Sequence, residues 1–362
     1  MNSRERFLTT LAGGIPDRIP SFELLIDERF RRAVRPDLDF YDFQEAMGFD
    51  MVLFGLGSDP VPLQWEDRQK RIFRDKWGVR QQFTTEAMPI QAEHRPLIDS
   101  GADLAAYTPP DPAHPLVLAQ VREVVRRFKG RMAIGYLGEE TFAVQQHLRG
   151  GLERLLFDYA EGSDLPRRIA RVVGDYYCEL FLNVIREGVE VIVLGDDYAG
   201  KHGPFVSPAH FREYIYPGLE RVMHTCKEAG ARVIKHTDGD LWPILDMIVE
   251  SGVDGLGPLE PVPTMRLSRI KAAYPRVTVV GNIDVALLST GTPEQVREAT
   301  RACIADAASG GRFILSSGNS ITSSVKPELY RALVDAKEEW GSYGPRGALA
   351  STLVCSSART ML

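Results

Sequence analysis

The chain has 362 residues, of which 44% are hydrophobic and 25% are charged, and its formal net charge is -6. These proportions are typical of a soluble globular protein and argue against a disordered, collagen-like or coiled-coil chain, and the net negative charge disfavours nucleic-acid and anionic-membrane surfaces. At roughly 150 residues per domain, the length fits two domains or one α/β barrel of about 250 residues with insertions.

Short β-rich apolar runs alternate with longer helical patterns along the chain, which is typical of βα units around a parallel sheet. The predicted strands are Ile19–Leu24, Met51–Leu56, Met132–Leu137, Val189–Leu194, Ala231–Lys235, Val253–Leu259, Val277–Val280 and Phe313–Leu315. Helical patterns between them include Leu165–Arg186, Pro208–Ala229 and Pro293–Ala308. Eight strands with intervening helices predict an α/β fold of the (β/α)8 TIM barrel type. No GxGxxG follows the first strand, which disfavours a dinucleotide-binding sheet.

Two segments depart from this alternation. Residues 63–96 contain strand-like aromatic patterns around Trp65 and Trp77, and are predicted to form a β-hairpin region inserted after the second barrel strand. We expect this region to stand outside the barrel and to roof or flank its mouth. Residues 344–362 have no clear period and are predicted to form a tail beyond a barrel domain of residues 1–343.

Polar residues follow six consecutive predicted strands, at the end of the barrel where such folds carry their chemistry. They are Glu139 and Glu140, Asp196 and Asp197, His236 and Asp238, Glu260, Asn282 and Asp284, and Asn319. A barrel end without a functional site would not need so many charged and amide side chains. The sequence therefore predicts a site at the carboxyl ends of the strands, with His236, Glu260, Asn282 and Asn319 facing one cavity.

His236 and Asp238 are the strongest candidates within this group. Residues i and i+2 of a strand point the same way, so the imidazole and the carboxylate are expected to converge on one ion or substrate. Gly239 would permit a sharp exit from the strand. Adjacent side chains diverge, so only one of Asp196 and Asp197 is expected to face the site.

Several motifs resemble the uroporphyrinogen decarboxylase superfamily, with similarity from about residue 2 to 343. They are Arg4-Glu5-Arg6, Pro16-Asp17-Arg18-Ile19-Pro20, Trp77-Gly78-Val79, Ser207-Pro208, His236-Thr237-Asp238-Gly239, Gly281-Asn282, Gly318-Asn319 and Pro327-Glu328. The resemblance implies a (β/α)8 barrel and one of two activities, porphyrinogen decarboxylation or corrinoid-dependent methyl transfer. The decarboxylases carry an N-terminal arginine motif that binds porphyrin carboxylates. Residues 19–27 lack it and hold Glu23 and Asp27, which would repel a polycarboxylate.

The methyltransferases of this superfamily bind zinc through a His-x-Cys-Gly motif and a later Gly-Cys. Here Asp238 and Asn319 replace the two cysteines, which implies a harder site that weakens the expectation of zinc and favours oxygen ligands. The expected site holds a divalent metal, or protonated acids in its place, with His236 and Asp238 as ligands and Glu260 and Asn319 as candidates for the remaining positions. The expected catalytic residues are His236, Asn282 and Asp197, the last orienting or protonating a leaving oxygen.

The expected activity is methyl transfer from a methoxylated or similar small molecule to a corrinoid, as in O-demethylase subunits. The segment around His236 matches only part of a cobalamin-binding Asp-x-His-x-x-Gly motif, because Ile234 stands in place of the aspartate. The corrinoid is therefore expected on a partner protein. Two alternatives stay open: a decarboxylase of a porphyrinogen or smaller carboxylate, served by Arg29 or Arg31, and a non-catalytic small-molecule-binding barrel.

The cysteines and the N-terminus predict a cytoplasmic location. The four cysteines lie far apart and lack metal-knuckle spacing, at Cys178, Cys226, Cys303 and Cys355. No signal-peptide core follows Met1, and no run of about 18 apolar residues occurs. We therefore expect reduced thiols in a soluble protein that is not exported.

Overall fold

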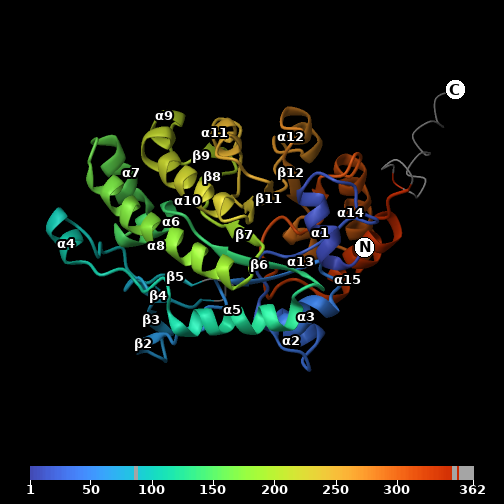
Figure 1. Ribbon diagram of the computed structural model, residues 1–362, viewed down its shortest axis with the longest axis horizontal. Coiled ribbons are helices and arrows are strands. Elements are labelled where there is room, and N and C mark those ends of the chain that lie inside the picture. The colour runs from blue at the N-terminus through green and yellow to red at the C-terminus, as the bar shows by residue number, and fades with distance from the viewer. Residues whose placement is uncertain (85–88, 345–348, 350–362) are drawn as a thin grey trace.

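A curled parallel sheet of seven strands forms the centre of the computed structural model, which describes residues 1–84, 89–344 and 349 (Figure 1). The strand order is β1-β6-β7-β10-β11-β12-β13. The strands are β1 (Met51–Gly55), β6 (Ala133–Gly138), β7 (Val191–Leu194), β10 (Arg232–Lys235), β11 (Gly255–Leu259), β12 (Thr278–Gly281) and β13 (Phe313–Ile314). Each overlaps a strand predicted from the sequence, so the α/β barrel class is confirmed.

The first predicted strand, Ile19–Leu24, requires a correction because it makes only isolated bridges. Ser21 bridges Leu315 in parallel, and the Leu315 N–H donates to the Pro20 carbonyl at 2.9 Å. On the other side, the Asp50 N–H donates to the Ser21 carbonyl at 2.8 Å. The segment thus fills the gap between β13 and β1. Pro20 has no N–H, so it cannot extend a regular ladder.

The inside of the ring is filled by an apolar cluster of its own. Its members are Phe7, Leu11, Phe22, Leu24, Met51, Leu53, Ala133, Leu137, Val191, Val193, Ile234, Val280 and Ile314. Alternate strand residues point inward, as the two-residue period of a strand requires. Phe7 and Leu11 come from α1 (Ser3–Leu11), whose first turn is fixed by a capping box between Asn2 and Glu5. The barrel interior is therefore a packed core.

Helices surround the sheet. They are α2 (Glu28–Val34), α3 (Phe40–Ala46), α4 (Gly101–Ala106), α5 (Pro115–Phe128), α6 (Phe142–Leu148), α7 (Leu152–Ala160), α8 (Leu165–Glu187), α9 (Pro208–His210), α10 (Tyr216–Glu228), α11 (Leu245–Glu250), α12 (Leu267–Ala273), α13 (Val285–Thr290), α14 (Pro293–Ala307) and α15 (Pro327–Trp340). Predicted helices Leu165–Arg186 and Pro293–Ala308 match α8 and α14. In the described part of the chain, no helix has the length and apolar character needed to cross a membrane.

The predicted helix Pro208–Ala229 forms, with one irregularity. A π-helical turn, Phe211–Ile215, joins α9 to α10. Pro217 lies two residues beyond this turn and has no N–H to donate back to the preceding turn, which explains the departure from regular α-helical hydrogen bonding.

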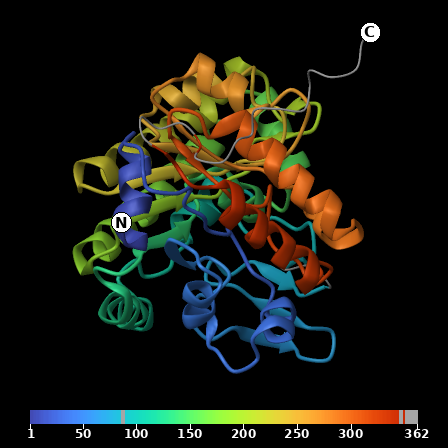
Figure 2. The same ribbon diagram turned by 90° about the vertical axis from the view of Figure 1, so that its right-hand side faces the viewer.

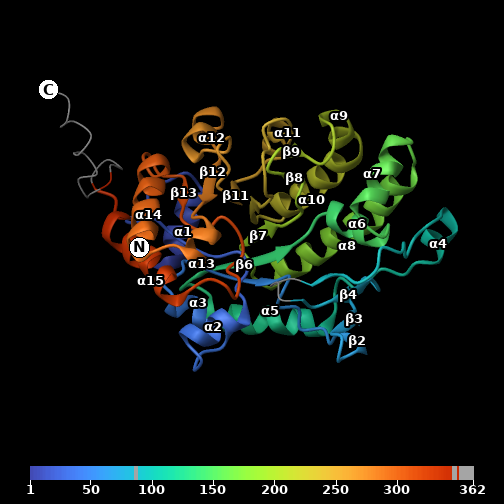
Figure 3. The ribbon, with the colours of Figure 1, turned by 180° about the vertical axis from the view of Figure 1, so that it is seen from behind.

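The inserted region folds outside the parallel sheet as consecutive β-hairpins, as predicted. Its strands are β2 (Gln64–Asp67), β3 (Ile72–Arg74), β4 (Arg80–Gln82) and β5 (Ile90–Gln91), antiparallel and in that order. The rings of Phe73 and Phe83 stack with centroids 4.8 Å apart, and Trp65 packs 5.6 Å from Phe73. Figures 2 and 3 show this sheet on the same side of the molecule as α2 and α3.

Two smaller features complete the description. A short hairpin of β8 (Ala199–Gly200) and β9 (Gly203–Pro204) follows β7. Of the predicted tail, residues 344–362, only Gly344 and Leu349 lie among the described residues. Cys355 also lies outside them, and the described cysteines Cys178, Cys226 and Cys303 are free thiols.

Candidate active site

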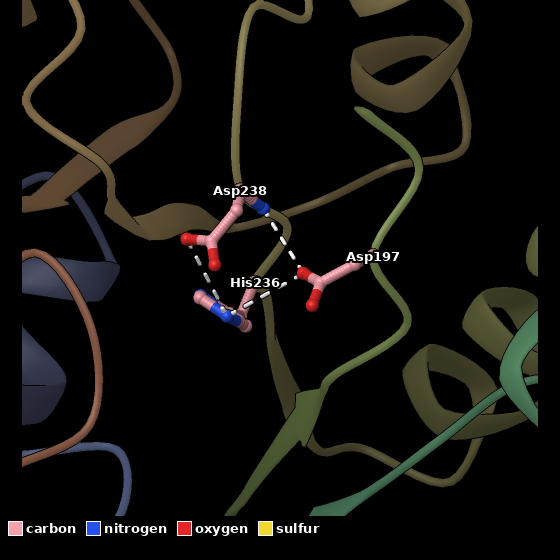
Figure 4. A group of neighbouring side chains, drawn as sticks. All are labelled: Asp197, His236 and Asp238. Carbon is pink, nitrogen blue, oxygen red and sulfur yellow. Dashed lines mark hydrogen bonds and ion pairs between the residues drawn. The ribbon is translucent and has the colours of Figure 1, made fainter. Parts of the chain in front are cut away.

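Three side chains from the carboxyl ends of two neighbouring strands come together (Figure 4). His236 directly follows β10, and its Nε2 lies 3.7 Å from Asp197 Oδ1 and 4.0 Å from Asp238 Oδ1. Asp197 comes from the loop after β7. One ligand atom of each residue lies within 4.8 Å of the others. The structure thus brings together three residues that were singled out in the sequence.

The backbone around this group is tightly fitted. The Asp238 N–H donates to Asp197 Oδ1 at 3.0 Å, which ties the two loops to each other. Gly239 has φ of 81°, and a Cβ there would lie 2.3 Å from the Gly200 carbonyl oxygen. Only glycine fits this position, so the prediction that Gly239 permits a sharp exit from the strand is confirmed.

A backbone carbonyl orients the His236 ring. Its Nδ1 lies 2.8 Å from the Pro258 carbonyl oxygen, and the side chain is almost completely buried. A carbonyl only accepts, so Nδ1 carries the proton in this pair and the neutral ring keeps its lone pair on Nε2. That lone pair is the one on the side of Asp197 and Asp238. His236 is therefore held in the tautomer that suits a metal ligand or a proton acceptor at Nε2.

Asp238 has one satisfied carboxylate oxygen and one unsatisfied oxygen. Asn319 Nδ2 donates to Oδ2 at 2.6 Å, whereas Oδ1 is shielded from solvent and has no hydrogen-bond partner among the described residues. Burial raises the pKa of Asp238 to about 6, and the charges of Asp197 and Glu260 act in the same direction against the opposing effect of His236. A buried acceptor without a donor carries an energetic cost that a bound cation would remove.

The donor set fits a divalent metal ion. It offers one imidazole nitrogen and carboxylate oxygens from Asp197 and Asp238, and no thiolate. Such ions take imidazole and carboxylate ligands at about 2.0 to 2.2 Å, so ligand atoms of one site lie a few ångströms apart, as these do. The unsatisfied Asp238 Oδ1 is the observation that most directly favours a cation here.

The other predicted site residues, Asn319, Glu260 and Asn282, do not all join the Asp197–His236–Asp238 group. Asn319 contacts Asp238, and it lines a cavity of about 230 Å³ together with Glu260. Glu260 Oε1 lies 3.6 Å from Lys201 Nζ. The Asn282 carboxamide oxygen instead lies 3.7 Å from Cys303 Sγ on α14. The structure therefore brings Asn319 to the Asp197–His236–Asp238 group, leaves Glu260 beside it, and directs Asn282 towards the helical layer.

Lys235 is a functional candidate that the sequence reasoning missed. Its side chain is fully buried, and Nζ donates to the carbonyls of Asp196 and His236, each at 2.7 Å. The third neighbour is Glu140, whose Oε1 lies 2.9 Å away. Lys235 thus joins the two loops that carry the Asp197–His236–Asp238 group. A lysine that ends an apolar strand was the available signal in the sequence.

The remaining acidic candidates have structural partners. Asp196 accepts hydrogen bonds from the Thr141 and Phe142 N–H groups at 3.0 and 2.5 Å, at the start of α6. Glu139 accepts from the Tyr177 hydroxyl at 2.8 Å, and burial raises its pKa to about 7. Because the Asp196 carboxylate accepts hydrogen bonds from the start of α6, only Asp197 of the adjacent pair faces the site.

A second, larger cavity opens at the same end of the barrel, with a volume of about 550 Å³. Residues of β1, β6 and the Ile19–Leu24 segment line it, together with Arg71 and Phe83 of the inserted sheet. Arg29, one of the two arginines named for the decarboxylase alternative, also lines it. Arg31 does not, since it is held by Glu28 and by the Leu38 carbonyl. The inserted sheet therefore flanks the mouth of the barrel.

Comparison with known proteins identifies one family. Residues 75–340 match the uroporphyrinogen decarboxylase (URO-D) family. The chain is 27% identical to a uroporphyrinogen decarboxylase of Schizosaccharomyces pombe over 52% of this chain and 52% of that protein. It is 26% identical to a methylated-thiol--coenzyme M methyltransferase of Methanosarcina mazei over 62% of this chain and 58% of that protein. The matched regions thus span only a little over half of these two relatives.

A solved structure described as a methyltransferase from Methanosarcina mazei has a similar fold. The TM-score is 0.72 at 18% sequence identity, and the match covers 94% of this chain and 99% of that chain. A uroporphyrinogen decarboxylase of Hahella chejuensis is 27% identical over 73% of this chain and 74% of its own length. The sequence relatives of this chain therefore include proteins named as decarboxylases and a protein named as a methyltransferase.

Proposed function

Because the chain belongs to the uroporphyrinogen decarboxylase family, we propose that it is a corrinoid-dependent methyltransferase of the O-demethylase type. It moves a methyl group from a methoxylated or similar small molecule to the corrinoid of a partner protein. The observation that carries this proposal is the Asp197–His236–Asp238 group with its unsatisfied Asp238 Oδ1. A nitrogen and oxygen donor set suits activation of an ether oxygen better than ionisation of a thiol.

The chain's own residues hold and orient the reacting groups. A divalent metal bound there would supply Lewis acidity towards the ether oxygen, and the partner's corrinoid would supply the nucleophile. His236 Nε2 and Asp238 Oδ1 are the proposed ligand atoms, and Asn319 fixes the Asp238 carboxylate through its 2.6 Å hydrogen bond. Asp197 is the third member of the group, and 50% of its side chain is exposed, so it is assigned to the substrate side, where it orients or protonates the leaving oxygen, and not to the metal.

A decarboxylase of a smaller carboxylate is the second candidate. One specific observation favours it, because Arg29 and Arg71 both line the 550 Å³ cavity at the barrel mouth. Guanidinium groups bind carboxylates with matched geometry. Release of carbon dioxide from a bound acid would identify this activity and would replace methyl transfer as the function.

The test combines metal analysis with a corrinoid methylation assay over a panel of methoxylated compounds. Wild type should bind a divalent metal and methylate the corrinoid, and His236→Ala should lose both, since no other imidazole lies in the group. His224→Ala is the matched control, because His224 is exposed and paired with Glu228 on α10. Full activity of His236→Ala would refute the mechanism, and neither metal nor turnover in wild type would favour a non-catalytic binding barrel.

A further inference from the structure

We propose that the 550 Å³ cavity at the barrel mouth, called here the mouth cavity, binds small amphipathic carboxylates, and that Arg71 of the inserted sheet selects them. The proposal rests on the proposed function for the identity of this ligand as the methyl donor. Together, the two proposals restrict the methyl donor to methoxylated compounds that carry a carboxylate. The binding itself depends only on residues that line the mouth cavity.

The mouth cavity has the size and the floor of a small-molecule site. Its volume of about 550 Å³ lies within the range of roughly 300 to 1,000 Å³ that is usual for ligand pockets. Leu24, Leu53 and Leu137 belong both to its lining and to the packed interior of the barrel. Phe54 and Phe83 add aromatic surface. The body of a ligand here would therefore rest on a rigid apolar floor.

The charged side chains that line the mouth cavity are not all paired with one another. Four charged residues line it, and two of these pair with each other, since Arg29 Nη2 lies 3.1 Å from Asp27 Oδ2. Glu28 is paired with Arg31 outside the lining, at 2.6 Å. Among the residues that the structure describes, Arg71 forms no ion pair with a carboxylate, and its contacts are with the Thr84 carbonyl and the Phe83 ring. The local charge is therefore positive at Arg71, which favours an anionic group on the ligand.

The Arg71 guanidinium is held in place with hydrogen-bonding capacity left. Nη1 donates to the Thr84 carbonyl at 2.9 Å, and the guanidinium carbon lies 5.4 Å from the centre of the Phe83 ring. Arginine has five N–H donors in a planar fork that matches the two oxygens of a carboxylate. A charge fixed by a ring and a carbonyl loses little side-chain freedom when a ligand binds.

The backbone at Arg71 supports a role beyond that of a turn residue. Arg71 has φ of 58° and joins β2 to β3, where the pairing register shifts between Trp65 and Asp67. Such a left-handed position at the end of a hairpin turn favours glycine or asparagine. An arginine there costs stability, and conformations of this kind concentrate at ligand sites.

The experiment measures binding by titration calorimetry, with 3-methoxybenzoate and its neutral analogue 3-methoxybenzamide as probes. The wild-type protein, without added metal or corrinoid, should bind the benzoate about tenfold or more tightly than the benzamide. Arg71→Gln and Arg71→Gly should both abolish that preference, and Arg71→Gly should unfold at a higher temperature because glycine relieves the strained backbone. Arg68→Gln is the matched control, since Arg68 lies in the same turn over Trp65 and outside the mouth cavity.

Three results would overturn the inference: no preference in wild type, an unchanged preference in the Arg71 variants, or no binding of either probe. Its failure is distinguishable from failure of the proposed function. Methyl transfer from neutral and acidic methoxy compounds at equal rates would reject the selection by Arg71 and leave the methyltransferase standing. Selective binding of the benzoate without methyl transfer would support the selection by Arg71 and reject the methyltransferase function.

Discussion

Asp196 and Asp197 are neighbours in the chain with separate tasks in the structure. Asp196 accepts hydrogen bonds from the first N–H groups of α6, and Asp197 faces His236. The divergence of adjacent side chains was predictable from the sequence, because it follows from backbone geometry. Which of the two faces the site was not, since that depends on α6, which starts more than 50 positions earlier in the chain.

The two replaced cysteine positions give a prediction at this scale. Asp238→Cys combined with Asn319→Cys should raise Zn²⁺ affinity, because two thiolates make a softer site beside His236. The same variant should gain no methoxy-donor activity, since thiolate ligands leave the metal less Lewis acidic. Zinc affinity is measured by competition with a chromophoric chelator, and activity by corrinoid methylation.

Asp238→Ser with Asn319→Ser is the control for the double replacement. It removes the same carboxylate and amide without adding thiolates, so its Zn²⁺ affinity should fall below that of wild type. Equal Zn²⁺ affinity in the cysteine variant and the serine control would contradict the proposed ligand positions.

At the scale of elements, the loop after β10 and the hairpin β8–β9 are fitted to each other around Gly239. The Asp240 N–H donates to the Gly200 carbonyl at 3.0 Å, next to the place where a Gly239 side chain would have to go. Lys235 joins the same loop to the one after β7. The sequence predicts the strands and the glycine turn, but not Lys235, because its partner Glu140 comes from another strand end.

Replacement of this glycine should separate packing from backbone strain. Gly239→Ala should cost about 3 kcal/mol or more and lower metal affinity about tenfold, because its Cβ would lie 2.3 Å from the Gly200 oxygen. Gly230→Ala is the matched control, with φ of 89° and nothing within 4 Å of its Cβ, and should cost only about 1 kcal/mol. Urea unfolding and metal titration check both variants, and equal losses in the two would show that the close contact at Gly239 is unimportant.

At the scale of the whole molecule, the ring is closed by an irregular segment and a buried acid. Glu23 lies in that segment and accepts hydrogen bonds from Ser317 Oγ at 2.5 Å and from the Tyr330 hydroxyl at 2.8 Å. It therefore ties the segment to the end of β13 and to α15. Burial raises the pKa of Glu23 to about 7 despite these hydrogen bonds, since a buried carboxylate loses its hydration.

This raised pKa makes the stability of the fold depend on pH. The folded state holds the Glu23 proton more tightly than the unfolded chain, whose ordinary value is 4.5. The contribution of the protonated group is therefore fully present below pH 4.5 and is lost as pH rises through about 7. The shift corresponds to about 3 kcal/mol.

Glu23→Gln should remove this dependence, because the amide does not ionise. The free energy of unfolding of wild type minus that of the variant should fall by about 3 kcal/mol between pH 4.5 and pH 8. Urea titrations at several pH values measure the difference. A difference that stays constant over this range would show that Glu23 does not titrate in the folded protein.

The sequence by itself determined the strand and helix pattern, the barrel class, the family resemblance and the convergence of His236 with Asp238. Each of these follows from local periodicity, from the two-residue period of a strand, or from short motifs. The tertiary structure decided what depends on contacts between distant segments. It placed Asn319 on Asp238, turned Asn282 towards Cys303, and brought Arg71 to the barrel mouth. It also reduced the first predicted strand to bridges, because pairing depends on the two neighbouring strands as well as on the apolar pattern of the segment.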